Sequence, residues 1–114
     1  MHTHSLAAYF NCLDRGDLDG FGQLMLSSAS KLAVAGVDFL ICPDNTIHQV
    51  THLVLPRSPR PWLHIAEVVA AEAVPYSFRS VGVLCTHWLV DNEVYAQALS
   101  AAGLEVVRPG ADEP

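Results

Sequence analysis

Apolar residues recur along the chain at two kinds of spacing, and these spacings predict its helices and strands. Three- and four-residue steps are typical of an amphipathic helix, and short apolar runs rich in β-branched residues are typical of a buried strand. The predicted helices cover residues 5–15, 18–35, 45–52, 62–74 and 91–102. The predicted strands cover residues 37–42, 80–86 and 104–107. Strands that alternate with helices in this way predict an α/β fold with a parallel sheet.

Small polar residues and glycines mark where these elements begin and end. Gly36 follows the second helix at the position of a left-handed C-terminal cap. Asn45 or Thr46 is predicted to cap the short helix that follows the first strand.

Composition excludes several classes of protein. The 114 residues are 51% hydrophobic, so the chain has the apolar surface that a disordered protein lacks. Only 6 Lys and Arg oppose 12 Asp and Glu, which argues against nucleic-acid binding. No apolar run reaches the roughly 18 residues of a membrane span, and the N-terminus lacks the pattern of a secretory signal. Cys12, Cys42 and Cys85 are an odd, widely spaced set that favours free thiols and a cytoplasmic location.

Polar residues follow two of the predicted strands directly. Asp44, Asn45 and Thr46 come after the first strand, and Thr86 with His87 comes after the second. Ligands of open parallel sheets bind at the carboxyl ends of the strands, so these residues are candidates for a binding site. All three residue types of the first group are also common in plain turns and helix caps, which remains the alternative.

Three segments taken together resemble the aspartate/glutamate racemase family, which is cofactor-independent. They are Phe39-Leu40-Ile41-Cys42-Pro43-Asp44-Asn45-Thr46-Ile47-His48, Pro61-Trp62-Leu63-His64-Ile65-Ala66 and Val81-Gly82-Val83-Leu84-Cys85-Thr86. His4-Ser5 near the start and an Ala-Gly helix end also match in order. The resemblance extends over about residues 4–108.

The resemblance implies a three-layer, parallel-sheet α/β fold made of two similar halves. Residues 1–78 would form most of the first half and residues 79–114 the start of the second. The family's first strand and its later Gly-Cys-Thr-Glu segment have no counterpart here, so the fold is expected to be truncated at both ends. An uncovered sheet edge predicts self-association, in the simplest case as a homodimer.

The resemblance also implies the chemistry, which is removal of the Cα proton of an amino acid and its return on the other face. Asn45, Thr46 and Thr86 would hold the substrate. Asp44 stands where most members have the first catalytic cysteine, and Cys42 lies two residues earlier, so either is a candidate base. Because the second catalytic cysteine is missing, the chain alone is expected to have little or no activity.

Two other interpretations stay open. The chain could be a non-catalytic remnant that binds a small carboxylate, or a related decarboxylase or cis–trans isomerase, which assays with malonates or maleate would separate. His48 and His52 have the i, i+4 spacing of a metal pair, but no third ligand is apparent, so no metal and no cofactor are predicted. The predicted partner is a small-molecule substrate, an acidic or other α-amino acid, with neither nucleic acid nor membrane.

Overall fold

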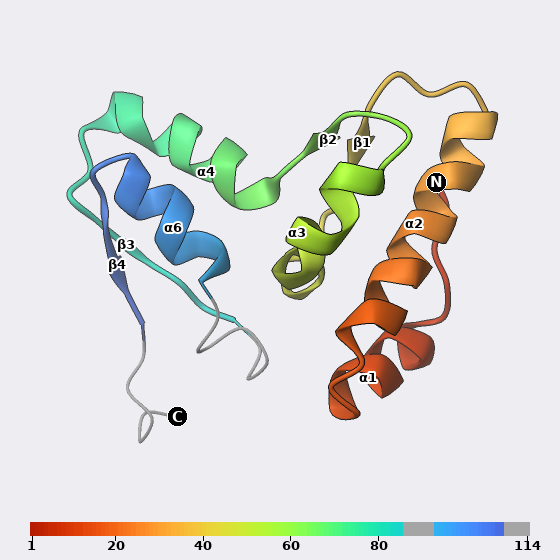
Figure 1. Cartoon of the computed structure of the whole chain (residues 1–114). Coiled ribbons are helices and arrows are strands. Elements are labelled where there is room, and N and C mark those ends of the chain that lie inside the picture. The colour runs from red at the N-terminus through yellow and green to blue at the C-terminus, as the bar shows by residue number, and fades with distance from the viewer. Residues whose placement is uncertain (86–92, 109–114) are drawn as a thin grey trace. The chain divides into compact units, whose positions relative to one another are not determined.

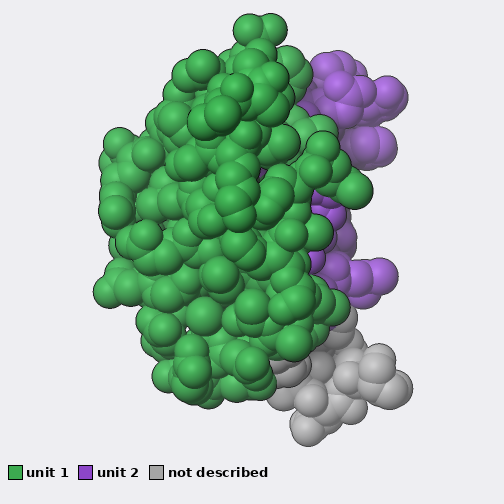
Figure 2. All heavy atoms as spheres, turned by 90° about the vertical axis from the view of Figure 1, so that its right-hand side faces the viewer, with its two compact units in different colours: residues 1–42, 50–63 green, residues 43–49, 64–114 purple. Residues whose placement is uncertain are grey.

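The computed structural model describes residues 1–85 and 93–108. These residues form two compact units, and each unit consists of two segments that alternate with those of the other unit along the sequence (Figure 1). Unit 1 holds Met1–Cys42 and Val50–Leu63, and unit 2 holds Pro43–Gln49 with the chain from His64 onward (Figure 2). The loop Pro43–Gln49 therefore belongs to a different unit from the strand that precedes it. The sequence predicts a boundary between two racemase halves at residue 78. The two compact units do not test this boundary, because they are defined by packing within this chain and not by the repeat of the family's halves. The boundary therefore stays a prediction.

Unit 1 begins with the two predicted helices. Helix α1 spans Leu6–Asp14 and is capped by Ser5, and α2 spans Leu18–Val34 and is capped by Asp17, whose Oδ1 accepts the Gly20 N–H at 2.8 Å. Gly36 has a φ of 91°, which confirms the predicted left-handed cap because only glycine adopts this conformation without strain. The buried face of both helices carries Tyr9, Cys12, Phe21, Met25 and Ala29.

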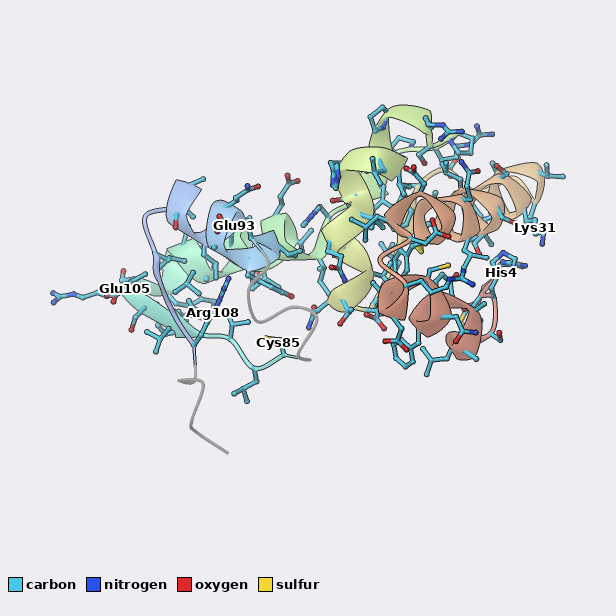
Figure 3. The ribbon with its side chains drawn as sticks, turned by 60° about the horizontal axis from the view of Figure 1, so that its bottom comes forward. His4, Lys31, Cys85, Glu93, Glu105 and Arg108 are labelled. Carbon is cyan, nitrogen blue, oxygen red and sulfur yellow. The ribbon has the colours of Figure 1, made fainter. Side chains whose placement is uncertain are left out.

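The N-terminal histidines are packed against these helices. His2 Nδ1 lies 2.8 Å from Ser28 Oγ on α2. His4, labelled in Figure 3, lies edge-on to the rings of His2 and Tyr9. Both histidines are half-buried.

A parallel strand pair completes unit 1. Strand β1 spans Leu40–Ile41 and pairs with β2, Trp62–Leu63, while the short helix α3, Thr51–Val54, lies between them in sequence. The prediction that residues 37–42 form a fully buried strand is wrong, because Leu40 is 5% exposed but Ile41 is 67% exposed. Successive side chains of a strand point to opposite faces of the sheet. Because this strand pair is covered on one face only, every second side chain lies on the uncovered face.

The prediction of a helix from Trp62 is also wrong. The Leu40 N–H donates to the Pro61 carbonyl at 2.8 Å, which holds the chain at Trp62 in an extended conformation beside β1. Helix α4 begins only at Ile65, where the His64 side chain caps it.

Unit 2 contains the second parallel pair and the two helices that cover it. Helix α4 spans Ile65–Ala73 and packs against α6, Val94–Ala101. Strand β3, Ser80–Gly82, pairs in parallel with β4, Glu105–Val107. The core between these elements consists of Ala66, Ala70, Val83, Tyr95, Leu99 and Leu104.

The parallel α/β class predicted from the sequence is confirmed, but its strand count is wrong. Within the described ranges there are four short strands in two separate pairs, where the sequence predicts three strands in one sheet. The additional strand is β2, which only its pairing with Leu40 and Ile41 reveals. Among the described helices, none combines the length and the apolar character required to cross a bilayer.

Candidate active site

The loop after β1 is organised by the carboxylate of Asp44. Its Oδ1 accepts the backbone N–H of Thr46 at 2.9 Å and that of Ile47 at 3.3 Å. These two bonds start the 3-10 helix Thr46–Val50. Asp44 is thus the cap, and the prediction that Asn45 or Thr46 caps this helix is wrong, because the carboxylate one residue earlier reaches the amides first.

Asn45 is held by a side chain from a distant part of unit 2. The Tyr95 hydroxyl donates to Asn45 Oδ1 at 2.6 Å. Burial raises the pKa of Tyr95, so the phenol stays protonated and remains a donor at neutral pH. Because the amide oxygen is held by this bond, the Asn45 NH₂ group, which is a pure donor, has one fixed orientation.

A buried histidine supports the loop. His48 is 1% exposed, and its Nδ1 lies 2.6 Å from the Asp44 carbonyl oxygen, which can only accept. Nδ1 therefore carries the proton. Burial lowers the pKa of His48, so the imidazole is neutral at pH 7.

A second histidine, His64, joins this loop to helix α4. Its ring lies edge-on to that of His48, with 4.9 Å between the centroids. His64 Nδ1 accepts the Ala66 N–H at 3.1 Å and so caps α4. An imidazole that caps through Nδ1 must be unprotonated there, and burial lowers the pKa of His64 accordingly.

These two histidines predict that the protein loses stability in mild acid. Both have an ordinary pKa of 6.5 that burial lowers in the folded state, so the unfolded chain binds more protons below about pH 6.5. The stabilisation is complete above that pH and decreases as the pH falls through the lowered values. Urea unfolding at about pH 7.5 and about pH 5.5 measures this loss while ordinary carboxylates stay ionised.

The His64→Asn variant provides the control for this pH dependence. Asparagine caps a helix well but does not titrate, so α4 keeps its cap and the acid-induced loss becomes smaller than in the wild type. An unchanged loss in the variant would show that His64 does not contribute.

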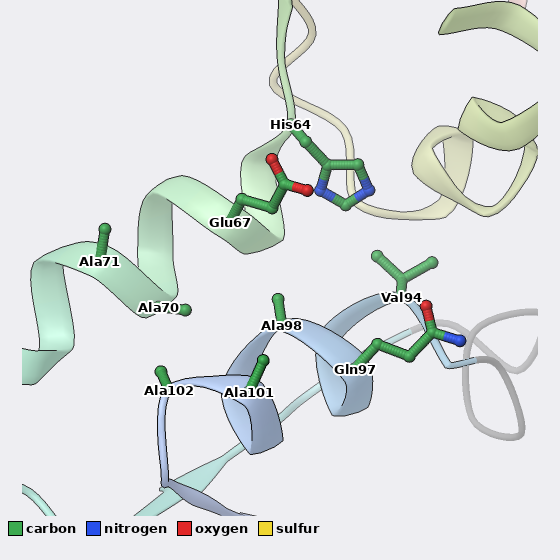
Figure 4. Close-up of a pocket in the computed structure, with 9 residues that line it drawn as sticks. All are labelled: His64, Glu67, Ala70, Ala71, Val94, Gln97, Ala98, Ala101 and Ala102. Atoms are coloured by element: carbon green, nitrogen blue, oxygen red, sulfur yellow. The ribbon is translucent and has the colours of Figure 1, made fainter.

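A groove opens between α4 and α6, with a volume of about 450 Å³ (Figure 4). His64, Glu67 and Gln97 are its polar lining residues, and Val94 and alanines from the α4 and α6 segments line the rest. The loop residues Asp44, Asn45 and Thr46 are not among its lining residues. The groove is therefore distinct from the strand-end loop. His64 is connected with both, because it lines the groove and its ring contacts His48 of the loop.

The structure brings three of the predicted site residues together in one turn. Asp44, Asn45 and Thr46 share one turn of unit 2, with Asn45 half-buried and Thr46 buried. Cys42 is half-buried at the end of unit 1. Thr86 lies outside the described residues. The i, i+4 pair His48 and His52 differs in environment, since His48 is buried and His52 is exposed.

Metal ligation has no support in the described ranges, where no group of three or more His, Cys, Asp and Glu side chains could hold an ion. Sequence reasoning missed the roles of Tyr95, His48 and His64. Tyr95 has the helical spacing of a core residue, and His64 lies inside the helix that the sequence predicts from residue 62, so the pattern does not mark it as a cap.

Comparison with known proteins identifies relatives over the whole chain. A family model for Asp/Glu/hydantoin racemases matches residues 1–114. The broad specificity amino-acid racemase RacX of Bacillus subtilis (strain 168) is 31% identical over 91 residues, which are 80% of this chain and 40% of that protein.

Two solved structures share the fold. One is a candidate Asp/Glu racemase from Yersinia pestis, with a TM-score of 0.83 and 25% identity over 95% of this chain and 47% of that one. The other is an aspartate racemase homologue from Pyrococcus horikoshii OT3, with a TM-score of 0.82 and 25% identity over 97% of this chain and 48% of that one. The chain thus spans less than half the length of each of these relatives.

Proposed function

The chain belongs to the Asp/Glu/hydantoin racemase family, and from this premise we propose that it acts on the Cα proton of an amino acid at the Asp44–Thr46 loop. The observation that supports this site is the arrangement of the loop itself. Asp44 Oδ1 fixes the turn through two backbone amides, and Asn45 presents a donor group beside it. A carboxylate next to an amide donor offers a base and a partner for the substrate carboxylate within one turn.

In the proposed reaction Asp44 Oδ2 takes the Cα proton and becomes a carboxylic acid. The electron pair left on Cα spreads onto the substrate carboxylate, where the Asn45 NH₂ group stabilises the added negative charge. Thr46 and Thr86 are proposed as further contacts to that carboxylate. Return of a proton to the opposite face completes racemisation, and this step needs a second acid. No Gly-Cys-Thr-Glu sequence occurs within the 114 residues, so the chain alone is expected to exchange the proton but to racemise slowly.

The test is deuterium incorporation at Cα from D₂O. The chain is incubated with a panel of L- and D-amino acids, and mass spectrometry and chiral chromatography follow label and configuration. We expect label in at least one enantiomer with little inversion. Absence of label in every amino acid would overturn the proposal.

A non-catalytic role in binding a small carboxylate is the second candidate. It is favoured by the fact that Asp44 already has a structural function as the cap of its own loop. Binding of an amino acid without any label incorporation would support this candidate.

A further inference from the structure

The contact between Tyr95 and Asn45 joins two parts of unit 2 that are 50 residues apart in the sequence. Tyr95 comes from the first turn of α6, and Asn45 comes from the loop after β1. At 2.6 Å between the two oxygens, this is a short hydrogen bond. A loop amide would otherwise rotate, and a bond of this kind fixes it in one orientation.

The tyrosine ring is packed in a core. Tyr95 is 9% exposed and belongs to the core cluster of unit 2, together with Ala66, Ala70 and Leu99. A ring packed in a core cannot swing to follow a loop side chain. The position of the Tyr95 hydroxyl is therefore set by the core, and it in turn sets the position of the Asn45 amide.

The direction of this hydrogen bond has a chemical consequence for any ligand. An asparagine amide that rotates freely can present either its oxygen or its NH₂ group. With the oxygen held by Tyr95, the amide no longer rotates, so its NH₂ group, a pure donor, points in one fixed direction. A ligand at this position must supply an acceptor, which a carboxylate does and an ammonium group does not.

We propose that Tyr95 is a positioning residue that fixes Asn45 as a donor and so selects a carboxylate at the Asp44–Thr46 loop. This inference rests on the proposed function, since it names the group of the substrate that Asn45 receives. Tyr95 acts through Asn45 and does not touch the substrate.

The first test is a double-mutant cycle on binding. The probes are L- and D-aspartate and L- and D-glutamate, and isothermal titration gives their dissociation constants. Removal of one hydroxyl in Tyr95→Phe is expected to weaken binding about 3- to 10-fold, the usual effect of one lost hydrogen bond. In an Asn45→Ala background the same change should have no further effect, because the residue through which Tyr95 acts is gone.

A role of Tyr95 in folding alone would give a different result. Tyr95→Phe would then weaken binding by the same factor in both backgrounds, and this outcome would overturn the proposal. Tyr76→Phe is the matched control, because Tyr76 is an exposed tyrosine of unit 2 that stacks on Phe78. Its loss of a hydroxyl should leave every dissociation constant unchanged.

The second test does not depend on a ligand. The side-chain NH₂ group of Asn45 gives two resonances in a ¹H–¹⁵N spectrum, and Tyr95→Phe should shift both while Tyr76→Phe leaves them in place. Unchanged Asn45 resonances would overturn the positioning role even if binding were detected. If the wild-type chain binds none of the four probes while the resonances shift, the hydrogen bond stands, but the selection of a carboxylate is overturned. The proposed function is overturned separately, by absence of label in every amino acid of the deuterium test.

Discussion

Asp44→Asn is expected to slow Cα deuterium exchange by about 100-fold or more while the free energy of unfolding stays within about 0.5 kcal/mol of the wild type. The two effects separate because asparagine and aspartate are equally good caps. The amide oxygen can still accept the Thr46 and Ile47 N–H groups, as Asp44 Oδ1 does. An amide cannot take up the Cα proton, so the chemical step loses its base.

Two further variants make this prediction specific. Asp44→Ala removes both the base and the cap, so it should match the exchange rate of Asp44→Asn and in addition lower the free energy of unfolding by about 1 kcal/mol. Cys42→Ser tests the alternative base, and we expect it to retain exchange. Mass spectrometry of the labelled amino acids measures the rates, and urea unfolding measures stability. Normal exchange in Asp44→Asn together with loss in Cys42→Ser would assign the base to Cys42.

The helices could be predicted from the sequence because their information is local. The apolar stripes that bury Tyr9 in α1 and Phe21 and Met25 in α2 repeat at helical spacing within each segment. Gly36 was predictable for the same reason, since its left-handed conformation depends only on the helix that it ends. Secondary structure of this kind needs no knowledge of distant residues.

Strand β2 could not be predicted because it exists only through a distant partner. Trp62–Leu63 is two residues long, and only His64 separates it from the apolar start of helix α4. Its extended conformation is fixed by pairing with Leu40 and Ile41, about twenty residues earlier in the sequence. A pattern read along one segment cannot contain that pairing.

In the candidate site, too, local features could be predicted from the sequence, whereas contacts between distant residues could not. The loop Asp44–Thr46 was predictable as polar residues after a strand, and the structure places all three in one turn. The sequence did not predict which residue caps the turn or which residue holds Asn45. Whether Asp44 or Asn45 caps the helix depends on which side-chain oxygen accepts the backbone N–H groups, and the sequence does not show this. Tyr95 is 50 residues from Asn45, and its position in the helix is typical of a core residue.

His48→Ala is expected to lower the free energy of unfolding by about 2–4 kcal/mol. His48 is among the most completely buried side chains described, so its removal leaves a cavity beside the ring of His64. Removal also takes away the Nδ1–H group that donates to the Asp44 carbonyl. The two losses add because one is lost packing and the other is an acceptor left without its donor.

Two control variants separate these contributions to the stability of the loop. His48→Asn keeps a donor that can reach the Asp44 carbonyl and should lose less stability than His48→Ala, although its side chain is smaller. His52→Ala removes an exposed histidine four residues away and should change the free energy of unfolding by less than about 0.5 kcal/mol. Urea midpoints at pH 7 measure all three variants. A loss in His48→Ala no larger than that in His52→Ala would mean that His48 does not support the Asp44–Thr46 loop, whereas a large loss rescued in part by asparagine would identify the Asp44 carbonyl bond as one of its supports.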